Sequence, residues 1–581
     1  HCQRYQFPIV MQKRFLVWLV FLFPFFAKGQ DITAFRQGNL FRKSASFSMG
    51  YNANTQWRDT LKVNSNAFVA SLRGNLEVAG IAFPLHLTYR TGQFSSGFDN
   101  PFVRFGISPY YKWIRLHVGH RSMQFSNYSL NGITFLGAGL ELNPGIFRLA
   151  AMYGNIQTPN YNLDSLAYYA NLIRDYKRKA HGVKIGIGKD RRFWDIYYLK
   201  VKDNYGDNQE AAIYKTLLPP AENLVLGTRI NMPFLKYFFF EFNGDLSTVT
   251  NNQLSKSDSL QDKRSRDIME YLSPYLTTNA TTRVNLAYDA SLRMMQKYFD
   301  LGIKFKHIDP NYTSFGMHYI IDDVQNYTVN GGVRLFQQKL SMNGSYGIQV
   351  NNLKNVRKNT STRNIMNLNA SIMPATNAGL QLMYSNYSID QTPGFAVVND
   401  SFRLVQQTAV LSLTPFYRTT GKISRHQLSF NYNQSSITDV SPVEIDNRDG
   451  KTGTYAFNWT FDRVVTKWGT SLTFLKADET FGQRSTGRWG GNASLRKRWE
   501  KSGLFFTLSG GYYSLNFNGA ADGHSTNLSL QSGISFNKAS NLQFMASWLD
   551  RASIQAVKYR EWRGSVNLIY SFFQKSKDGK K

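Results

Sequence analysis

The chain has 581 residues, of which 18% are charged and 15% aromatic, and its formal net charge at pH 7 is +30. A helical membrane protein needs long apolar runs and a disordered chain lacks aromatic residues, so this composition excludes both. It fits β-strands that are apolar on one face only. The basic excess indicates partners that carry negative charge.

The first element in chain order is a secretory signal peptide. Lys13-Arg14 precedes the apolar run Phe15–Phe26, and Ala27-Lys28-Gly29 then gives the small-x-small pattern of a cleavage site. The run is shorter than the roughly 20 residues of a membrane-spanning helix, which disfavours an anchor. Because an exported chain rarely meets nucleic acid, we expect no nucleic-acid partner; phosphates of lipopolysaccharide or anionic solutes are the expected counter-charges.

The single cysteine, Cys2, lies upstream of this peptide. The mature chain, expected to begin at Gln30, therefore contains no cysteine. That excludes disulfides, zinc–thiolate sites and thiol nucleophiles, and we expect no cofactor and no metal site.

Apolar and polar residues alternate with a period of two from residue 44 to residue 573. In the last such segment, Val566, Leu568, Tyr570 and Phe572 alternate with mostly polar neighbours. Segments of about ten residues with this pattern are typical of transmembrane β-strands, which have lipid on one side and water on the other. The predicted fold class is all-β: a transmembrane antiparallel up-and-down β-barrel of about 26 strands (between about 24 and 28), without an N-terminal plug domain.

In chain order, the predicted strands begin near Ser44, Ala67, Ile81, Phe102, Ile114, Phe135, Ile146, Gly182, Phe193, Leu224, Tyr237, Val284, Phe299, Thr328, Lys339, Asn364, Ala378, Phe402, Arg425, Thr454, Trp468, Arg488, Leu504, Asn527, Leu542 and Trp562.

The connections between these strands alternate in length. Those after even-numbered strands are tight, as at Ala79-Gly80 and Asn143-Pro144-Gly145. Those after odd-numbered strands are long and polar, at residues 53–65, 91–101, 155–180, 203–222, 249–283, 309–327, 435–452 and 515–526. Outer-membrane barrels have short periplasmic turns and longer extracellular loops, so this order predicts periplasmic termini.

The terminal strand, Gly564–Phe573, resembles the last strands of outer-membrane β-barrel proteins, which commonly end in an aromatic residue that the assembly machinery recognises. Ala27-Lys28-Gly29 before Gln30-Asp31 and the turn Asn143-Pro144-Gly145 are similar to porin-like proteins of the Bacteroidota. The resemblance implies a Gram-negative outer membrane, contact with its lipid and lipopolysaccharide, and insertion by the barrel-assembly machinery. The basic residues after Phe573 depart from this pattern, because many such proteins end on the aromatic residue.

The expected organisation is an upstream start-site artefact (1–10), the signal peptide (11–29), a short lead-in (30–43), a single transmembrane β-barrel (44–573) and a basic C-terminal tail (574–581).

A ring of this size encloses a wide lumen, because barrel diameter grows roughly linearly with strand number. The lead-in is too short to be a plug, so loops or a partner must fill or gate the lumen. Loops 155–180 and 249–283 contain apolar residues, at helical spacing in the first of them. Each could fold inward as a constriction, stand outward as a lid, or form a solvated surface loop. A separate lumen-filling or periplasmic partner protein is the remaining alternative.

The polar faces of the early strands are rich in cations. If these faces point inward, one wall of the lumen is electropositive and could bind carboxylate or phosphate groups through charge-assisted hydrogen bonds. The alternative is that the cations form a structural ladder with Glu77, Glu141 and neighbouring hydroxyls. The candidate anion-binding residues are Arg73, Arg90, Arg104, Lys112, Arg115, Arg121, Arg148 and Lys184.

No catalytic arrangement can be recognised in the sequence. The histidines lack metal-ligand spacing, and His117 and His120 should face opposite sides of one strand. A hydrolase needs a serine, a histidine and an orienting polar residue together, and the serines are too abundant for the sequence to select one. For Asp322-Asp323, in a predicted outer loop, calcium binding and simple solvation are both open. We expect that the chain is not an enzyme.

The leading interpretation is an outer-membrane porin-like channel or transport barrel that admits small solutes, with anions favoured by a partly electropositive lumen. The alternative is a structural or secretion- or assembly-associated outer-membrane barrel, whose lumen is filled by a partner protein or by inward-folded loops. A lipid-modifying hydrolase at the surface ranks third.

Overall fold

The computed structural model describes residues 41–78, 81–91, 102–157, 176–204, 219–255, 270–357, 359–393, 404–441, 449–537 and 539–573. The predicted signal peptide (11–29), the lead-in up to residue 40 and the predicted basic tail (574–581) lie outside the described residues.

The strands are β1 (Phe41–Arg58), β2 (Leu61–Val78), β3 (Ile81–Thr91), β4 (Phe102–Ile107), β5 (Tyr110–Tyr111), β6 (Ile114–Arg121), β7 (Phe135–Leu142), β8 (Phe147–Gln157), β9 (Lys177–Lys189), β10 (Arg192–Asn204), β11 (Glu222–Phe234), β12 (Phe238–Thr250), β13 (Thr282–Met295), β14 (Phe299–Ile308), β15 (Val324–Leu335), β16 (Leu340–Asn351), β17 (Asn359–Ala375), β18 (Ala378–Pro393), β19 (Leu404–Arg418), β20 (Ser424–Asp439), β21 (Gly450–Arg463), β22 (Trp468–Phe481), β23 (Arg484–Trp499), β24 (Leu504–Phe517), β25 (Ala520–Ser535), β26 (Ser540–Ser553) and β27 (Tyr559–Phe573).

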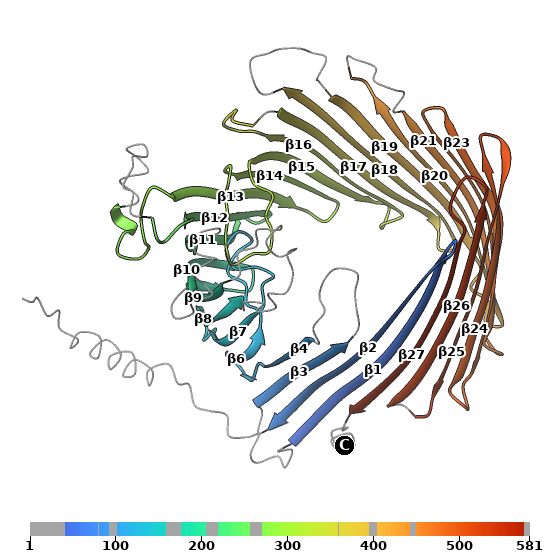
Figure 1. Ribbon diagram of the computed structural model, residues 1–581, viewed down its shortest axis with the longest axis horizontal. Coiled ribbons are helices and arrows are strands. Elements are labelled where there is room, and N and C mark those ends of the chain that lie inside the picture. Colours follow the sequence, from blue (N-terminus) through green and yellow to red (C-terminus); the bar gives the residue numbers. More distant parts are fainter. Residues whose placement is uncertain are drawn as a thin grey trace, which may run out of the picture.

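These strands form a single closed ring (Figure 1). Sequential strands pair antiparallel, and β1 pairs with β27 from Ser44↔Phe573 to Arg58↔Tyr559, which closes the sheet. β4 and β5 share one place in the ring, since both pair with β3 and β6 and only Ser108-Pro109 separates them. The fold is therefore a closed 26-strand antiparallel β-barrel, with no plug domain evident in the described part of the chain. This confirms the predicted fold class.

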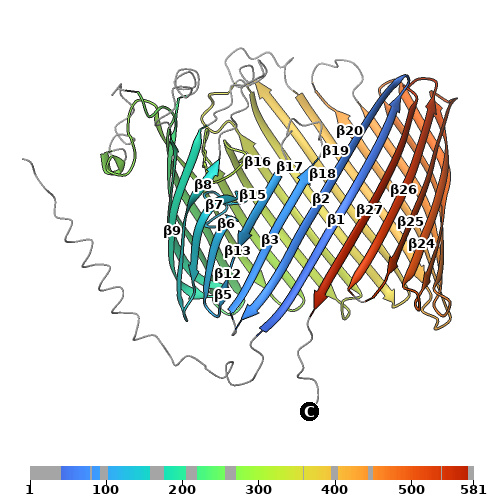
Figure 2. The same ribbon diagram turned by 60° about the horizontal axis from the view of Figure 1, so that its bottom comes forward.

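The barrel has two distinct ends (Figure 2). β1 begins and β27 ends at one end, which we call the terminal rim; the opposite end is the loop rim. Tight connections such as residues 190–191 and 376–377 lie at the terminal rim, and the long connections lie at the loop rim. The predicted long/short order is thus largely correct, and the even number of wall strands brings the start of β1 and the end of β27 to the same rim.

Two of the predicted long connections are wrong. Instead of loops over 53–65 and 515–526, the structure has two-residue turns at Asp59-Thr60 and Asn518-Gly519. The latter is a typical hairpin turn, with φ of 47° at Asn518 and 82° at Gly519. Near these turns the strand ends mix polar residues with Trp57, Leu61, Val63 and Phe517, without a regular alternation. Their backbone pairing continues there, but the apolar alternation that signals a strand does not.

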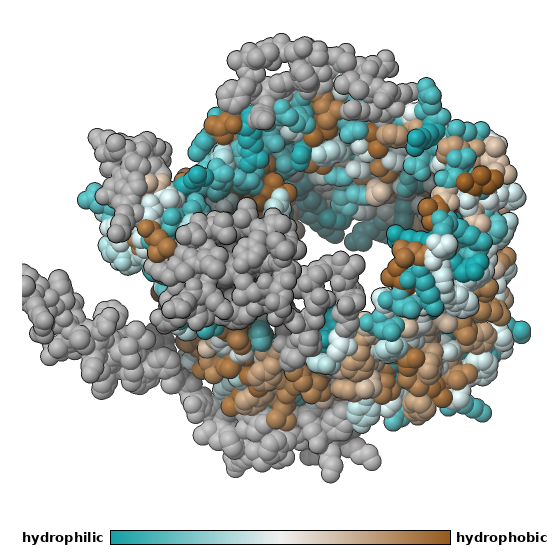
Figure 3. Space-filling model, viewed as in Figure 1, coloured by the Kyte–Doolittle hydropathy of each residue, from teal (hydrophilic) through white to brown (hydrophobic). Residues whose placement is uncertain are grey.

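The alternation sorts side chains between lumen and exterior, as strand geometry requires. On β10, Asp195 and Tyr197 point inward and are buried, whereas Ile196 between them points outward and is 53% exposed. Phe474 and Val329, also outward, are 54% and 49% exposed. Figure 3 shows apolar residues along the outer wall. An exposed apolar belt of this extent requires an apolar environment such as lipid.

Among the residues that the structure describes, no helix is long and apolar enough to cross a membrane.

Candidate functional site

The lumen contains two segments of the chain that enter from the loop rim (Figure 1). The first inner segment, residues 122–134, joins β6 to β7; the second inner segment, residues 309–323, joins β14 to β15. Both pack on the inward face of the wall near β7–β15 and build a buried core there. The wall, in contrast to an ordinary water-filled barrel, therefore has large buried side chains on its inner face over part of its circumference.

The first inner segment is anchored by apolar side chains. Phe125 and Leu130 are fully buried, and Met123 is buried beside them against inward side chains of β7–β11. Glycines in the wall leave the necessary space: a Cβ at Gly182 would lie 2.7 Å from the Phe125 ring, and one at Gly139 would lie 2.6 Å from the Met123 sulfur. These glycines place the segment close to the wall.

Hydroxyls fix the same segment to two buried wall carboxylates. Ser126 Oγ donates to Asp245 Oδ2 over 2.9 Å, and the Tyr128 hydroxyl donates to Asp289 Oδ1 over 2.6 Å. The wall residue Tyr197 donates to Asp245 as well, over 2.9 Å. Burial and the hydrogen bond to Asp289 raise the pKa of Tyr128 well above its ordinary value, so its hydroxyl remains a donor.

The second inner segment lies on the first. The Tyr312 hydroxyl donates to the Tyr128 carbonyl over 2.8 Å, and Ser314 Oγ donates to the Ser129 carbonyl over 2.8 Å. The Phe315 amide donates to Asn223 Oδ1 of β11 over 3.0 Å. The two segments and the wall thus form one hydrogen-bonded unit.

The sequence interpretation did not identify the first inner segment, and it treated 309–327 as an ordinary outer loop. A signal was present in both. Phe125, Tyr128 and Leu130 are large apolar or aromatic residues in a stretch otherwise rich in Ser and Asn, and Tyr312 follows the polar residues Asp309 and Asn311. Residues of this kind in a connection indicate burial against something.

Several wall cations are bound to carboxylates across the sheet. The Arg148 guanidinium donates to both oxygens of Asp195, over 2.7 and 3.0 Å, and Arg178 donates likewise to Asp203, over 2.6 and 3.1 Å. Both carboxylates are fully buried. Arg148 on β8 bonds to Asp195 on β10 across Gly186 of β9, where a Cβ would lie 2.0 Å from the Asp195 carboxylate.

Three further candidates point into the lumen and contact neighbouring groups. Arg115 lies 3.8 Å from Glu141, a member of the predicted structural ladder. Arg121 donates to the backbone carbonyls of Pro84 and Gly106. Lys184 Nζ donates to the Gln124 carbonyl of the first inner segment over 3.0 Å.

The remaining candidates differ in position. Arg73 is exposed on β2, where it pairs with His86 of β3, and Arg90 and Arg104 lie on the same inward register of β3 and β4. The side chain of Arg104 lies outside the described residues. Lys112 requires a correction: with φ 49° it occupies the turn Lys112-Trp113 at the terminal rim, because β5 ends at Tyr111 and β6 begins at Ile114.

The rest of the inner wall, from β16 through β27 to β2, is mostly lined by small neutral polar side chains. A cavity of about 340 Å³ on this wall is lined by Ser341, Asn343 and Thr414 among others. Hydrogen bonds between side chains on adjacent strands occur at Ser48–Ser71 (2.7 Å), Ser471–Ser494 (2.6 Å) and Ser509–Ser529 (2.6 Å). This part of the lumen offers mainly hydroxyl and amide groups, with charges at single positions such as Arg488, Arg551 and the Glu561–Arg563 ion pair of 2.8 Å.

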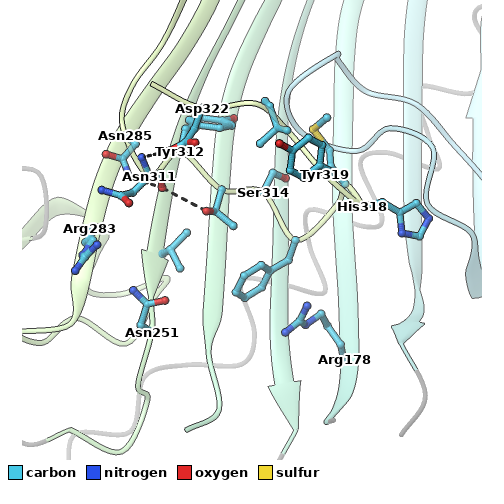
Figure 4. A pocket seen from close by; sticks show the side chains of 15 residues that line it. Arg178, Asn251, Arg283, Asn285, Asn311, Tyr312, Ser314, His318, Tyr319 and Asp322 are labelled. Atoms are coloured by element: carbon cyan, nitrogen blue, oxygen red, sulfur yellow. Dashed lines mark hydrogen bonds between the residues drawn. The ribbon is translucent and has the colours of Figure 1, made fainter. Parts of the chain in front are cut away.

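A larger cavity of about 520 Å³ lies between the second inner segment and β9, β12 and β13 (Figure 4). Arg178, Arg283, Asn251 and Asn285 line it from the wall, and Phe315 lines it from the segment. The Arg178 guanidinium lies 4.1 Å from the centre of the Phe315 ring. Arg283 is exposed and forms no ion pair with a described residue. The cavity is therefore polar, with one uncompensated guanidinium.

Residues 249–255 and 270–283 of the predicted loop 249–283 are described, and residues 270–277 lie outside the ring (Figure 1). Leu272 and Leu276 pack against Leu224 on the outward face of β11, and the Thr277 amide donates to Glu222 over 3.2 Å. We call residues 270–277 the outer flap. For this portion the inward alternative is wrong, because an apolar patch on the outer wall receives its leucines. Residues 158–175 of the other predicted loop lie outside the described residues.

A serine, a histidine and an acid do meet in the barrel wall. Ser108 Oγ lies 2.8 Å from His117 Nδ1, and His117 Nε2 lies 3.1 Å from Glu141 Oε1. Ser108 interrupts the wall strand between β4 and β5, and both Ser108 and His117 are buried. We interpret these two hydrogen bonds as structural contacts that stabilise the wall where the strand is interrupted between β4 and β5. Among the described residues, no three His, Cys, Asp or Glu side chains are placed to hold a metal ion.

No family model matches the sequence, and no curated protein matches it. Among solved structures, the P pilus usher (PapC) translocation pore aligns with a TM-score of 0.36 and 9% identity over 92% of this chain and 100% of that one. Pseudomonas aeruginosa OccK2 (OpdF) aligns with a TM-score of 0.29 and 10% identity over 91% and 98%. Acinetobacter baumannii OccAB3 aligns with a TM-score of 0.28 and 10% identity over 91% and 99%. At these scores we draw nothing about function from the likeness.

Proposed function

We propose that the chain is a porin-like outer-membrane channel or transport barrel that admits small polar solutes and favours anions. The observation that carries the proposal is the division of the wall, apolar outside and polar inside, around an opening that is visible within the ring (Figure 3). An apolar exterior places the barrel in lipid, and a hydroxyl- and amide-lined interior gives solutes a polar path.

The proposed orientation has the loop rim outside the cell and both termini in the periplasm. Its support is the length of the connections, which are short at the terminal rim and mostly longer at the loop rim. The predicted signal peptide is consistent with this location and stays a prediction.

The preference for anions is supported by the balance of charges in the lumen. Asp195 and Asp203 are neutralised by arginines, and Asp245 is occupied by hydroxyl donors. In contrast, the inward-pointing Arg73, Arg229 and Arg283 form no ion pair with a described residue. They lie on three separate strands, β2, β11 and β13, so their positive potential is distributed around the lumen. Arg178, which lines the same cavity as Arg283, is already paired with Asp203 and therefore adds no free positive charge to the lumen.

Recording from the purified protein in planar bilayers tests this proposal. The wild type should show stable conductance and an anion-selective reversal potential in a salt gradient. The triple variant Arg73→Gln/Arg229→Gln/Arg283→Gln should lose several-fold in the ratio of anion to cation permeability. The control variant Lys177→Gln/Lys179→Gln/Lys202→Gln also removes three cations, but from the outward face of the wall, and it should keep the wild-type ratio of anion to cation permeability. Equal selectivity in all three proteins would contradict the preference for anions.

A second candidate is a structural or secretion- or assembly-associated barrel whose lumen is closed by inward loops or by a partner protein. The two inner segments favour it, because they already occupy part of the lumen. Absence of conductance together with stoichiometric co-purification of another protein would favour this candidate over the channel.

A further inference from the structure

A cluster of lysines lies on the outer surface of the barrel, near the loop rim. Lys177 and Lys179 are on β9, and Lys200 and Lys202 are on β10. The register pairs Lys202 with Lys179, so these residues are direct neighbours on adjacent strands. They share the outward face with Ile196, since side chains separated by an even number of residues point the same way.

Three of these lysines are available to a ligand. Lys200 forms an ion pair of 3.0 Å with Glu222, and its Nζ donates to the Tyr275 carbonyl of the outer flap. Lys177, Lys179 and Lys202 are exposed and have no ion pair with a described residue. We call these three residues the lysine patch. Among the described residues, the acid beside it is Glu222, which Lys200 and the Thr277 amide already engage, so it does not neutralise the three lysines of the patch.

An apolar surface begins directly below the lysine patch. Moving toward the terminal rim, the outward pairs of β9 and β10 are Ile185 with Ile196 and Ile187 with Trp194, which are 44%, 53%, 57% and 50% exposed. With a rise of about 3.3 Å per residue, Lys179 and Lys202 lie roughly 20 Å from Ile185 and Ile196 along the strands, and roughly 13 Å from the intervening outward pair Val183 and Tyr198. That separation fits a headgroup above its own acyl chains.

The outer flap adds aromatic groups at the same level. Leu272 and Leu276 hold the flap against the wall, while Tyr271 and Tyr275 are 83% and 63% exposed. Tyrosines with this exposure are typical of a membrane interface, where one end of the ring meets lipid and the hydroxyl meets water.

We propose that the lysine patch binds the phosphates of a bisphosphorylated glycolipid of the lipid A class, with its acyl chains on the apolar surface of β9 and β10. The inference rests on the proposed outer-membrane location, with the loop rim in the outer leaflet. Several lysines spread over two strands suit a ligand with two separated phosphates better than a phospholipid with one. The tyrosines of the flap then lie against the sugar backbone.

Native mass spectrometry of the full-length barrel with added lipid A tests the proposal. The wild type should retain bisphosphorylated lipid A and release lipid A from which both phosphates have been removed. The variant Lys177→Gln/Lys179→Gln/Lys202→Gln should bind the bisphosphorylated form about a hundredfold more weakly, because each lysine near a phosphate-bearing surface contributes about 1 kcal/mol.

The matched control removes three cations from the terminal rim, in Lys189→Gln/Lys236→Gln/Lys297→Gln, and should bind lipid A as the wild type does. Equal binding by both variants, or equal retention of phosphatidylglycerol, would overturn the proposal. Conductance of the lysine-patch variant is measured in parallel. A barrel that binds lipid A but does not conduct contradicts the proposed channel and leaves this inference standing; the reverse result contradicts this inference alone.

Discussion

Bidentate ion pairs are the characteristic residue-scale feature of the wall beneath the inner segments. The Asp195 and Asp203 carboxylates are fully buried, and each accepts two hydrogen bonds from one guanidinium. Removing a carboxylate from water costs several kcal/mol unless a well-placed cation compensates it. Arg148, predicted as an anion-binding residue, is therefore committed to the structure of the wall.

Removing Arg148 should destabilise the barrel. We expect Arg148→Met to lower the free energy of unfolding by about 3–5 kcal/mol, because it leaves Asp195 buried without a counter-charge. Urea unfolding in detergent micelles, followed by tryptophan fluorescence, measures the change. The double variant Arg148→Met/Asp195→Asn should recover part of the loss, whereas identical stability of the single and double variants would refute the explanation.

A surface pair gives the control for this measurement. Lys467 lies 3.2 Å from Glu500 at the terminal rim, with both side chains well exposed. Lys467→Met should change the unfolding free energy by at most about 1 kcal/mol, since exposed ion pairs contribute little.

At the scale of elements, connections that contain large apolar residues have two opposite placements. The inner segments insert aromatic side chains into the lumen, whereas the outer flap places its leucines on the exterior wall. The difference depends on which face of the local wall carries an apolar patch. Gly182 and Gly139 make room on the inside for Phe125 and Met123, and Leu224 offers a contact on the outside for the flap.

Shortening the first inner segment should widen the pore. Replacing residues 123–132 with a short Gly-Ser linker removes the buried Phe125 and Leu130, and we expect single-channel conductance to rise about twofold, because the open cross-section limits ion flow. Bilayer recording measures this.

The outer flap provides the contrasting element. Leu272→Ser/Leu276→Ser should detach the flap from the wall and leave conductance unchanged, since the flap lies outside the lumen. A rise in conductance in the flap variant would contradict the placement of the flap outside the pore, and no rise in the shortened protein would show that the first inner segment does not restrict the pore.

At the scale of the whole molecule, closure of the ring depends on the pairing of the first and last strands. β1 and β27 pair in continuous register from Ser44↔Phe573 to Arg58↔Tyr559. A closed sheet leaves no unpaired edge in the membrane, where an unsatisfied backbone group costs several kcal/mol.

A disulfide across this seam should form without disturbing the barrel. Ser46 and Ser571 are direct partners with inward side chains, and opposite residues in antiparallel strands have Cα atoms about 4.5–5.5 Å apart, within the range for a disulfide. We expect Ser46→Cys/Ser571→Cys to oxidise, to migrate faster in the denatured state on a non-reducing gel, and to keep wild-type conductance. The offset pair Ser46→Cys/Leu568→Cys, whose side chains point to opposite faces, should not crosslink. Equal crosslinking of both pairs would contradict a fixed register.

The sequence by itself determined the barrel, its strand number and its connections at the terminal rim. A membrane imposes these through local patterns: one apolar face per strand and a tight turn after every second strand. The predicted starts at Ile81, Phe102, Phe135 and Phe299 coincide with the observed ones. For the strands that follow the two loop-rim turns, the predicted starts, Ala67 and Asn527, come later in the sequence than the observed starts, Leu61 and Ala520. The reason is that the residues next to these turns do not alternate regularly between apolar and polar.

Only the tertiary structure decided what occupies the lumen and which cations remain available there. The direction of Arg148 and Lys184 follows from alternation, but their partners Asp195 and Gln124 are distant in sequence or lie in an irregular connection. Arg148 bonds to Asp195 only because Gly186 of the intervening strand has no side chain to block it. Such contacts depend on register across several strands, and a period of two residues along one strand carries no information about its neighbours.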